Sequence, residues 1–206
     1  MILMNQLLSA LLQCFLLTAI PFIWYFLHSR KASGFFRWLG LKPAEAVPWK
    51  AIGVIFVGFV LVTLLPYWYL YQTGSLTYSG FTVDSYRQTG WSIETVLVIL
   101  IWAVLQTSLS EEIFFRGFLC KRFCNVWGWK IGTAVQAVLF GAIHFPAVWG
   151  KGVLPAVVVF LLTGGIGFAL GWLSQRKAEG SILYGWGIHA AVNILSPIVG
   201  FCFLLE

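Results

Sequence analysis

The stretch IETVLVILIWAVLQTSLSEEIFFRGFLC, residues 93–120, is apolar enough to cross a lipid bilayer, yet it contains Glu111, Glu112 and Arg116. Charged side chains at the depth of a membrane helix are costly, by roughly 2.5–3.5 kcal/mol each on insertion scales. Three of them within two helical turns need a specific reason. We interpret the cluster as a functional site inside a membrane protein.

The composition of the chain supports this class. Hydrophobic residues make up 60% of the 206 residues and charged residues only 10%, whereas soluble proteins carry roughly 25% charged residues. A helix needs about twenty apolar residues to span a bilayer. The sequence predicts an all-α membrane protein, a polytopic bundle of about six transmembrane helices, at residues 5–27, 51–71, 93–120, 131–148, 154–174 and 181–204.

No polar stretch is long enough to separate two folded domains, so residues 1–206 are interpreted as a single transmembrane domain. Residues 1–90 supply two N-terminal spans and their loops, and residues 91–206 carry the motifs. The first span lacks a basic leader and a small-residue cleavage site, which favours a permanent anchor over a signal peptide.

Positive charges indicate the orientation of the bundle. Loops 28–50, 121–130 and 175–180 contain ten of the 13 Lys and Arg residues, and the opposite loops contain only Arg87 and Lys151. Basic loops face the cytoplasm, so we expect a multi-pass membrane protein with both termini on the non-cytoplasmic side. The net charge of +6 then reflects topology and contact with membrane lipids, and nucleic-acid binding is not expected.

Helix geometry divides the charged cluster in two. At 100° per residue, Glu112 and Arg116 lie about 40° apart and can form an i,i+4 ion pair, whereas Glu111 and Arg116 lie about 140° apart. Glu112 is therefore the expected structural partner of Arg116. Glu111 remains available as a general base.

Polar residues in two other hydrophobic segments could complete a site. His144 follows Phe140 by one helical turn, and Gly185, His189 and Asn193 form an i,i+4 stripe. The glycine permits close approach of a neighbouring helix, and the other two side chains can direct hydrogen-bond donors to one point. Alternatively, His144 is a hydrogen-bonded packing residue, and the stripe is a polar seam between helices.

Together these groups can hydrolyse an amide, which requires a base for water and donors for the oxyanion. The order E-E-x-x-x-R (111–116), F-x-x-x-H (140–144) and H-x-x-x-N (189–193) resembles the CPBP family of intramembrane proteases. This family is also called Abi, or CAAX protease and bacteriocin-processing, and includes the type II CAAX prenyl endopeptidases. The resemblance spans about residues 90–200.

The resemblance implies an intramembrane endopeptidase that acts on a membrane-associated protein or peptide. It assigns Glu111 and His144 to the attacking water, and His189 and Asn193 to the oxyanion hole. The motifs also contain three supporting residues, Glu112, Arg116 and Phe140.

Three alternatives remain at the level of sequence. Glu111, His144 and His189 could bind zinc with water as a fourth ligand, but the metal-independent hypothesis is favoured because it also uses Asn193. His144 and His189 could instead bind haem, although this leaves the Glu-Glu-Arg cluster unexplained. The third alternative is a non-catalytic membrane scaffold or immunity-type binding protein.

The predicted spans place Glu111 and His144 at different depths. Simple counting separates them by on the order of 10 Å along the membrane normal. A shared site therefore requires helix tilt, a third helix that continues to about Phe123, or a fourth segment that starts deeper.

Overall fold

The computed structural model describes residues 1–72 and 90–204, and every regular element in these two ranges is helical. This confirms the all-α class. The α-helices are α1 (Ile2–Ser29), α2 (Phe35–Leu39), α3 (Trp49–Gln72), α5 (Ile93–Leu100), α6 (Lys121–His144), α7 (Val153–Trp172) and α8 (Leu183–Leu204). The other elements are the π-helices η1 (Ile101–Leu109), η2 (Glu112–Cys120) and η4 (Leu173–Lys177), and the 3-10 helix η3 (Phe145–Lys151).

Within the described residues, three helical stretches are long and apolar enough to cross a membrane: Ile2–Ser29, Ile93–His144 and Val153–Lys177. A shorter apolar helix covers Trp49–Val62. These lengths and compositions support an integral membrane protein. The number of six spans stays a prediction.

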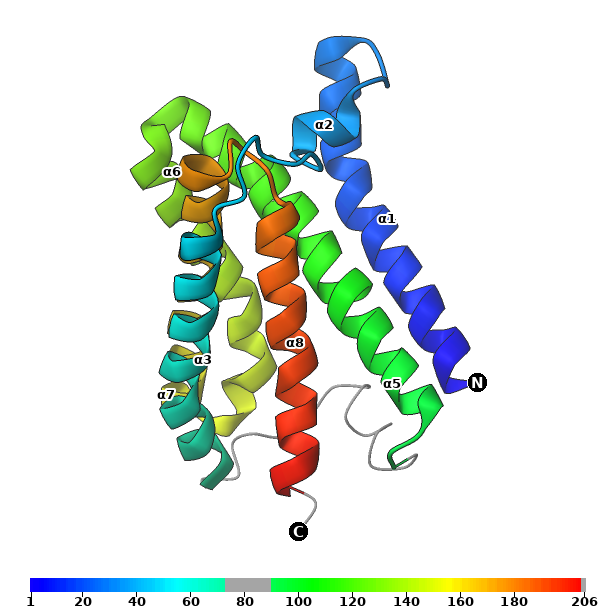
Figure 1. Ribbon diagram of the computed structural model, residues 1–206, viewed down its shortest axis with the longest axis vertical. Coiled ribbons are helices and arrows are strands. Elements are labelled where there is room, and N and C mark those ends of the chain that lie inside the picture. The colour runs from blue at the N-terminus through cyan, green and yellow to red at the C-terminus, as the bar shows by residue number, and fades with distance from the viewer. Residues whose placement is uncertain (73–89, 205–206) are drawn as a thin grey trace.

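A single helical rod forms the centre of the fold. It runs through α5, η1, η2 and the first turns of α6, and it ends at Gly128, whose φ of 75° and ψ of 164° interrupt the helix. A glycine adopts this conformation without the penalty that a Cβ would bring. The helix thus extends beyond residue 120, where the predicted third span ends, and continues to Trp127 before the chain turns back (Figure 1).

Small residues let the part of α6 that follows Gly128 pack closely against α7. A Cβ placed on Gly141 would lie 2.7 Å from the carbonyl oxygen of Phe160, and one on Gly171 would lie 2.8 Å from the Thr133 methyl group. Close approach of backbones is the usual basis of helix association in lipid, where no hydrophobic effect drives helices together.

The helix α1 lies beside the central rod (Figure 1), and polar side chains join it to η1. Gln6 donates to the side chain of Gln106, and Gln13 donates to the Gln106 carbonyl oxygen over 2.8 Å. In an apolar environment such groups need partners, since an unpaired amide loses its bonds to water without compensation. The polar seam therefore fixes the register of α1 on the central rod.

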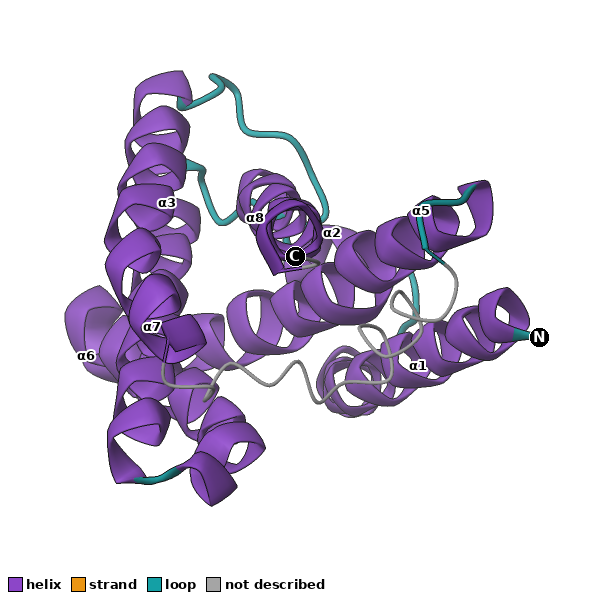
Figure 2. Cartoon of the chain, turned by 90° about the horizontal axis from the view of Figure 1, so that it is seen from below, coloured by secondary structure: helices purple, strands orange, loops and turns teal. Residues whose placement is uncertain are grey.

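The helix α8 lies between α3 and the central rod (Figure 2). The three basic loops gather at one end of the bundle, the upper end in Figure 1, and the termini lie toward the other end. At the basic end, Ile182 N donates to the Gly40 carbonyl oxygen over 2.9 Å, which joins the chain before α8 to the end of α2. The motif residues of η2 and α8 thereby meet in the interior.

Candidate active site

One carboxylate oxygen connects the two motif helices. Glu112 Oε1 lies 3.2 Å from Arg116 Nη1 and 3.2 Å from His189 Nδ1. The i,i+4 ion pair predicted from the sequence is present, and it is buried. His189 of α8 is an additional partner of the same glutamate, which the helical spacing on η2 could not predict.

Gly185 makes this contact possible. A Cβ at residue 185 would lie 3.0 Å from Glu112 Oε2. The predicted role of the glycine, to let a neighbouring helix approach, is therefore confirmed, and the neighbour is the Glu112 carboxylate. His189, one turn further along α8, then reaches the same carboxylate.

Glu111 occupies a different environment from Glu112. Its Oε2 lies 3.8 Å from His189 Nε2, and 12% of its side chain is exposed, against 11% for His189. The side chains of Glu112 and Arg116 are 1% and 0% exposed. The site thus has an inner Glu112–Arg116 pair and an outer Glu111–His189 pair, and the outer pair is the more exposed of the two.

The Phe140 ring is the common contact of the remaining site residues. The Arg116 guanidinium lies 4.1 Å from its centroid, a cation–π geometry. The His144 and His189 rings approach it edge-on, with centroid distances of 4.7 Å and 6.1 Å. His144 Nδ1 lies 2.7 Å from the Phe140 carbonyl oxygen of its own helix, which leaves Nε2 for another partner.

The turn at Gly128 places Glu111 and His144 on two antiparallel parts of the chain. Glu111 precedes Gly128 by 17 residues and His144 follows it by 16, on arms that run in opposite directions. Phe115 and Phe140, about one turn nearer to Gly128, are in contact at 5.0 Å between centroids. The Phe140 ring in turn contacts both His144 and His189, the partner of Glu111, so the longer third helix brings the two motif segments into one region of the bundle. No hydrogen bond or ion pair joins Glu111 to His144 in the described part of the chain.

Asn193 is held on the central rod. Its Nδ2 donates to Thr107 Oγ1 over 2.8 Å and lies 3.4 Å from Ser108 Oγ. The sequence analysis did not identify Thr107. Its position one turn before Glu111, beside Ser108 and Ser110 in an otherwise apolar stretch, is the signal that could have found it.

The side chains do not fit a metal site as they are arranged. Among residues 1–72 and 90–204, no three His, Cys, Asp or Glu side chains are grouped so that they could hold a metal ion. Three such ligands are the usual minimum of a catalytic zinc site. The zinc ligand set considered from the sequence, Glu111, His144 and His189, is not grouped in this way, and the choice between a glutamate-type and a zinc-type protease stays a prediction.

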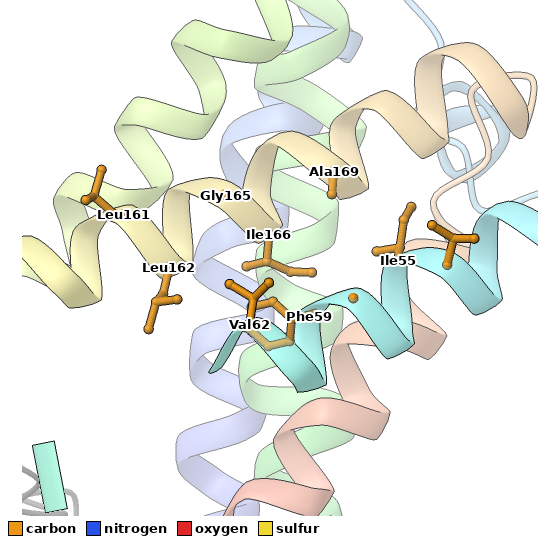
Figure 3. A pocket seen from close by; sticks show the side chains of 10 residues that line it. Ile55, Phe59, Val62, Leu161, Leu162, Gly165, Ile166 and Ala169 are labelled. Atoms are coloured by element: carbon orange, nitrogen blue, oxygen red, sulfur yellow. The ribbon is translucent and has the colours of Figure 1, made fainter. Parts of the chain in front are cut away.

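A groove between α3 and α7 lies apart from these residues (Figure 3). Its walls are entirely apolar, and Gly165 leaves open space on the α7 side. None of the motif side chains lines it. The groove offers no group for catalysis, so the candidate site is confined to the interface of η1, η2, α6 and α8.

Comparison with known proteins identifies the family. A family model described as type II CAAX prenyl endopeptidase Rce1-like matches residues 93–195, half of the chain. The chain belongs to this family. All of the motif residues lie inside the match, and the CPBP resemblance stated from the sequence is confirmed.

One curated relative of the Rce1-like chain is a Bacillus subtilis (strain 168) protein named "Uncharacterized protein YyaK". The two are 27% identical over 183 residues, which cover 86% of this chain and 56% of the relative. The chain thus spans about half the length of the curated relative that it matches. No solved structure matches it.

Replacing each glutamate in turn by glutamine tests whether the inner pair and the outer pair have different roles. Glu112→Gln leaves Arg116 buried without its counter-charge, and we expect it to lose about 3–5 kcal/mol of stability. Glu111→Gln leaves the Glu112–Arg116 pair intact, so its unfolding midpoint should stay near that of the wild type. Thermal unfolding in detergent measures both. Because the two substitutions are isosteric and adjacent, each serves as the control for the other. Equal losses of stability would contradict the different roles of the two glutamates.

Proposed function

We propose that this protein is an intramembrane endopeptidase that hydrolyses a peptide bond of a membrane-associated protein or peptide. The observation that carries the proposal is the slightly exposed Glu111–His189 pair, set against the buried Glu112–Arg116 pair within the residues that match the Rce1-like family. Membership of this family favours a peptidase.

Glu111 is the proposed base, with His144 as the second group on the attacking water. Of the two glutamates, it is the one without an arginine partner and with access to substrate. The water oxygen bonds to the scissile carbonyl carbon while its proton moves to Glu111. The same proton then passes to the leaving nitrogen as the C–N bond breaks.

His189 and Asn193 are the proposed donors to the oxyanion. His189 Nδ1 lies against Glu112, so its Nε2 is directed to the Glu111 side of the site. Glu112 and Arg116 balance each other's charge in the buried part of the site, where uncompensated charge is costly.

A comparison of membranes tests the proposed activity. We expect membranes that contain the wild-type protein to gain a new peptide terminus that is absent with Glu111→Gln, because the amide cannot accept a proton from water. Proteomics of peptide termini measures this, with both proteins expressed at the same level. A phenotype that persists with Glu111→Gln, with no new terminus, would instead favour a membrane scaffold or immunity-type protein.

The proposed chemistry uses no metal. Cleavage should therefore survive prolonged treatment with a strong chelator, and elemental analysis should find well under about one zinc per chain. Loss of activity on chelation, with recovery on addition of zinc, would overturn the glutamate-type mechanism in favour of a zinc-dependent protease.

We also propose that the protein crosses the membrane six times, with its basic loops in the cytoplasm and both termini outside. The support is the grouping of loops 28–50, 121–130 and 175–180 at one end of the bundle. In a background without native cysteines, Gly150→Cys should react with an impermeant maleimide on intact cells, whereas Lys31→Cys should react only after permeabilisation. The reverse pattern would invert the topology.

A further inference from the structure

The π-helix η1 has a row of carbonyl groups that accept side-chain hydrogen bonds. Thr107 donates to Trp102 O or Ala103 O, over 3.0 Å and 3.3 Å. The next three carbonyls accept bonds from α8 and α1: Val104 O from Trp186, Leu105 O from Cys14 and Gln106 O from Gln13. Helical carbonyls that take extra bonds in this way lie where the helix departs from regular α geometry.

Thr107 both donates a hydrogen bond within its own helix and receives one from a motif residue, Asn193. Backbone carbonyls only accept, so the single hydroxyl proton of Thr107 is committed to Trp102 or Ala103. Its oxygen must then act as the acceptor toward Asn193, at 2.8 Å. This requirement places the NH₂ group of Asn193, and not its oxygen, on the Thr107 side.

The orientation matters because the two ends of a carboxamide have opposite effects on an oxyanion. An N–H group stabilises the developing negative charge, and the amide oxygen would repel it. With one N–H of Asn193 bound to Thr107 at 2.8 Å, the second N–H lies at the same end of the group, where its contact is the longer one of 3.4 Å to Ser108 Oγ, and an oxyanion would have to take the place of that contact. Thr107 also lies one turn before Glu111 on the continuous central rod, so this bond sets the position of Asn193 relative to the base.

We propose that Thr107 is a positioning residue, which fixes the carboxamide of Asn193 with its NH₂ group toward the reacting carbonyl. Thr107 itself touches neither substrate nor water in this scheme. The proposal rests on the proposed function, because it assumes that Asn193 serves the oxyanion.

Removal of the Thr107 hydroxyl should slow the chemical step. We expect Thr107→Val to lower kcat by roughly 10–100-fold with little change in KM, because a misplaced donor weakens transition-state binding more than substrate binding. Thr107→Ser keeps the hydroxyl and should retain most of the rate. The substrate is a synthetic peptide spanning the Glu111-dependent cleavage site, assayed in detergent, and thermal unfolding checks each variant. If Thr107→Val is not recovered folded, Thr107→Ala removes the same hydroxyl and takes its place.

Thr163 provides a matched control. Its hydroxyl also donates to a carbonyl of its own helix, Val159 O at 2.7 Å, on the apolar helix α7. Thr163→Val therefore removes the same kind of bond away from the site and should leave kcat unchanged. An equal loss of rate in Thr163→Val and Thr107→Val would reduce the Thr107 effect to general destabilisation and overturn the proposal.

A double-mutant cycle tests whether Thr107 acts through Asn193. Asn193→Ala should lower kcat by roughly 10²–10³-fold, and Thr107→Val should have no further effect in that background. Additive losses, or a wild-type rate in Thr107→Val alone, would overturn the positioning role while leaving the oxyanion hole in place. A wild-type rate in Asn193→Ala would overturn both the oxyanion assignment and the role of Thr107, and the loss of cleavage in Glu111→Gln would still identify an endopeptidase.

Discussion

The arrangement of the site depends on one buried carboxylate oxygen. Glu112 Oε1 is 3.2 Å from both Arg116 and His189, in a bundle whose other interior side chains are mostly apolar. A buried charge without a partner is strongly destabilising, so η2 and α8 must meet where this contact is made. Gly185 leaves room for the carboxylate, and Phe140 brings α6 to the guanidinium. Three helices are thereby fixed relative to one another by a single charge.

This contact makes two adjacent glutamates unequal. Glu112 is held by Arg116 and His189 and is closed to solvent, whereas Glu111 lies at a longer distance from His189 Nε2 and is slightly exposed. The two glutamates are adjacent in the helix and point about 100° apart, which turns Glu111 away from Arg116. Structural and chemical roles can thus be carried by neighbouring residues of the same type, because the environment decides which can exchange a proton.

Local geometry explains which parts of the site could be predicted from the sequence. The Glu112–Arg116 pair and the close approach at Gly185 follow from helical spacing, and both are present. The contact of Asn193 with Thr107 joins residues 86 positions apart, and helical periodicity holds no information about such a pair. The sequence does not fix the continuation of the helix to Trp127, because Lys121 and Arg122 resemble a loop in composition, although the backbone breaks only at Gly128. The depth difference counted from the sequence depends on this boundary.

Hydrogen bonds from α1 and from α8 hold the central rod, and α1 lies outside the residues that match the Rce1-like family. Gln13 of α1 donates to Gln106 O over 2.8 Å, and Trp186 of α8 donates to Val104 O over 2.8 Å. Both bonds end on the π-helix that directly precedes Glu111 and Glu112. In lipid, such bonds have no competition from water, so they set the rotation of the rod about its axis. The helix α1 therefore contributes to the direction in which the glutamates point, although it supplies no residue to the site.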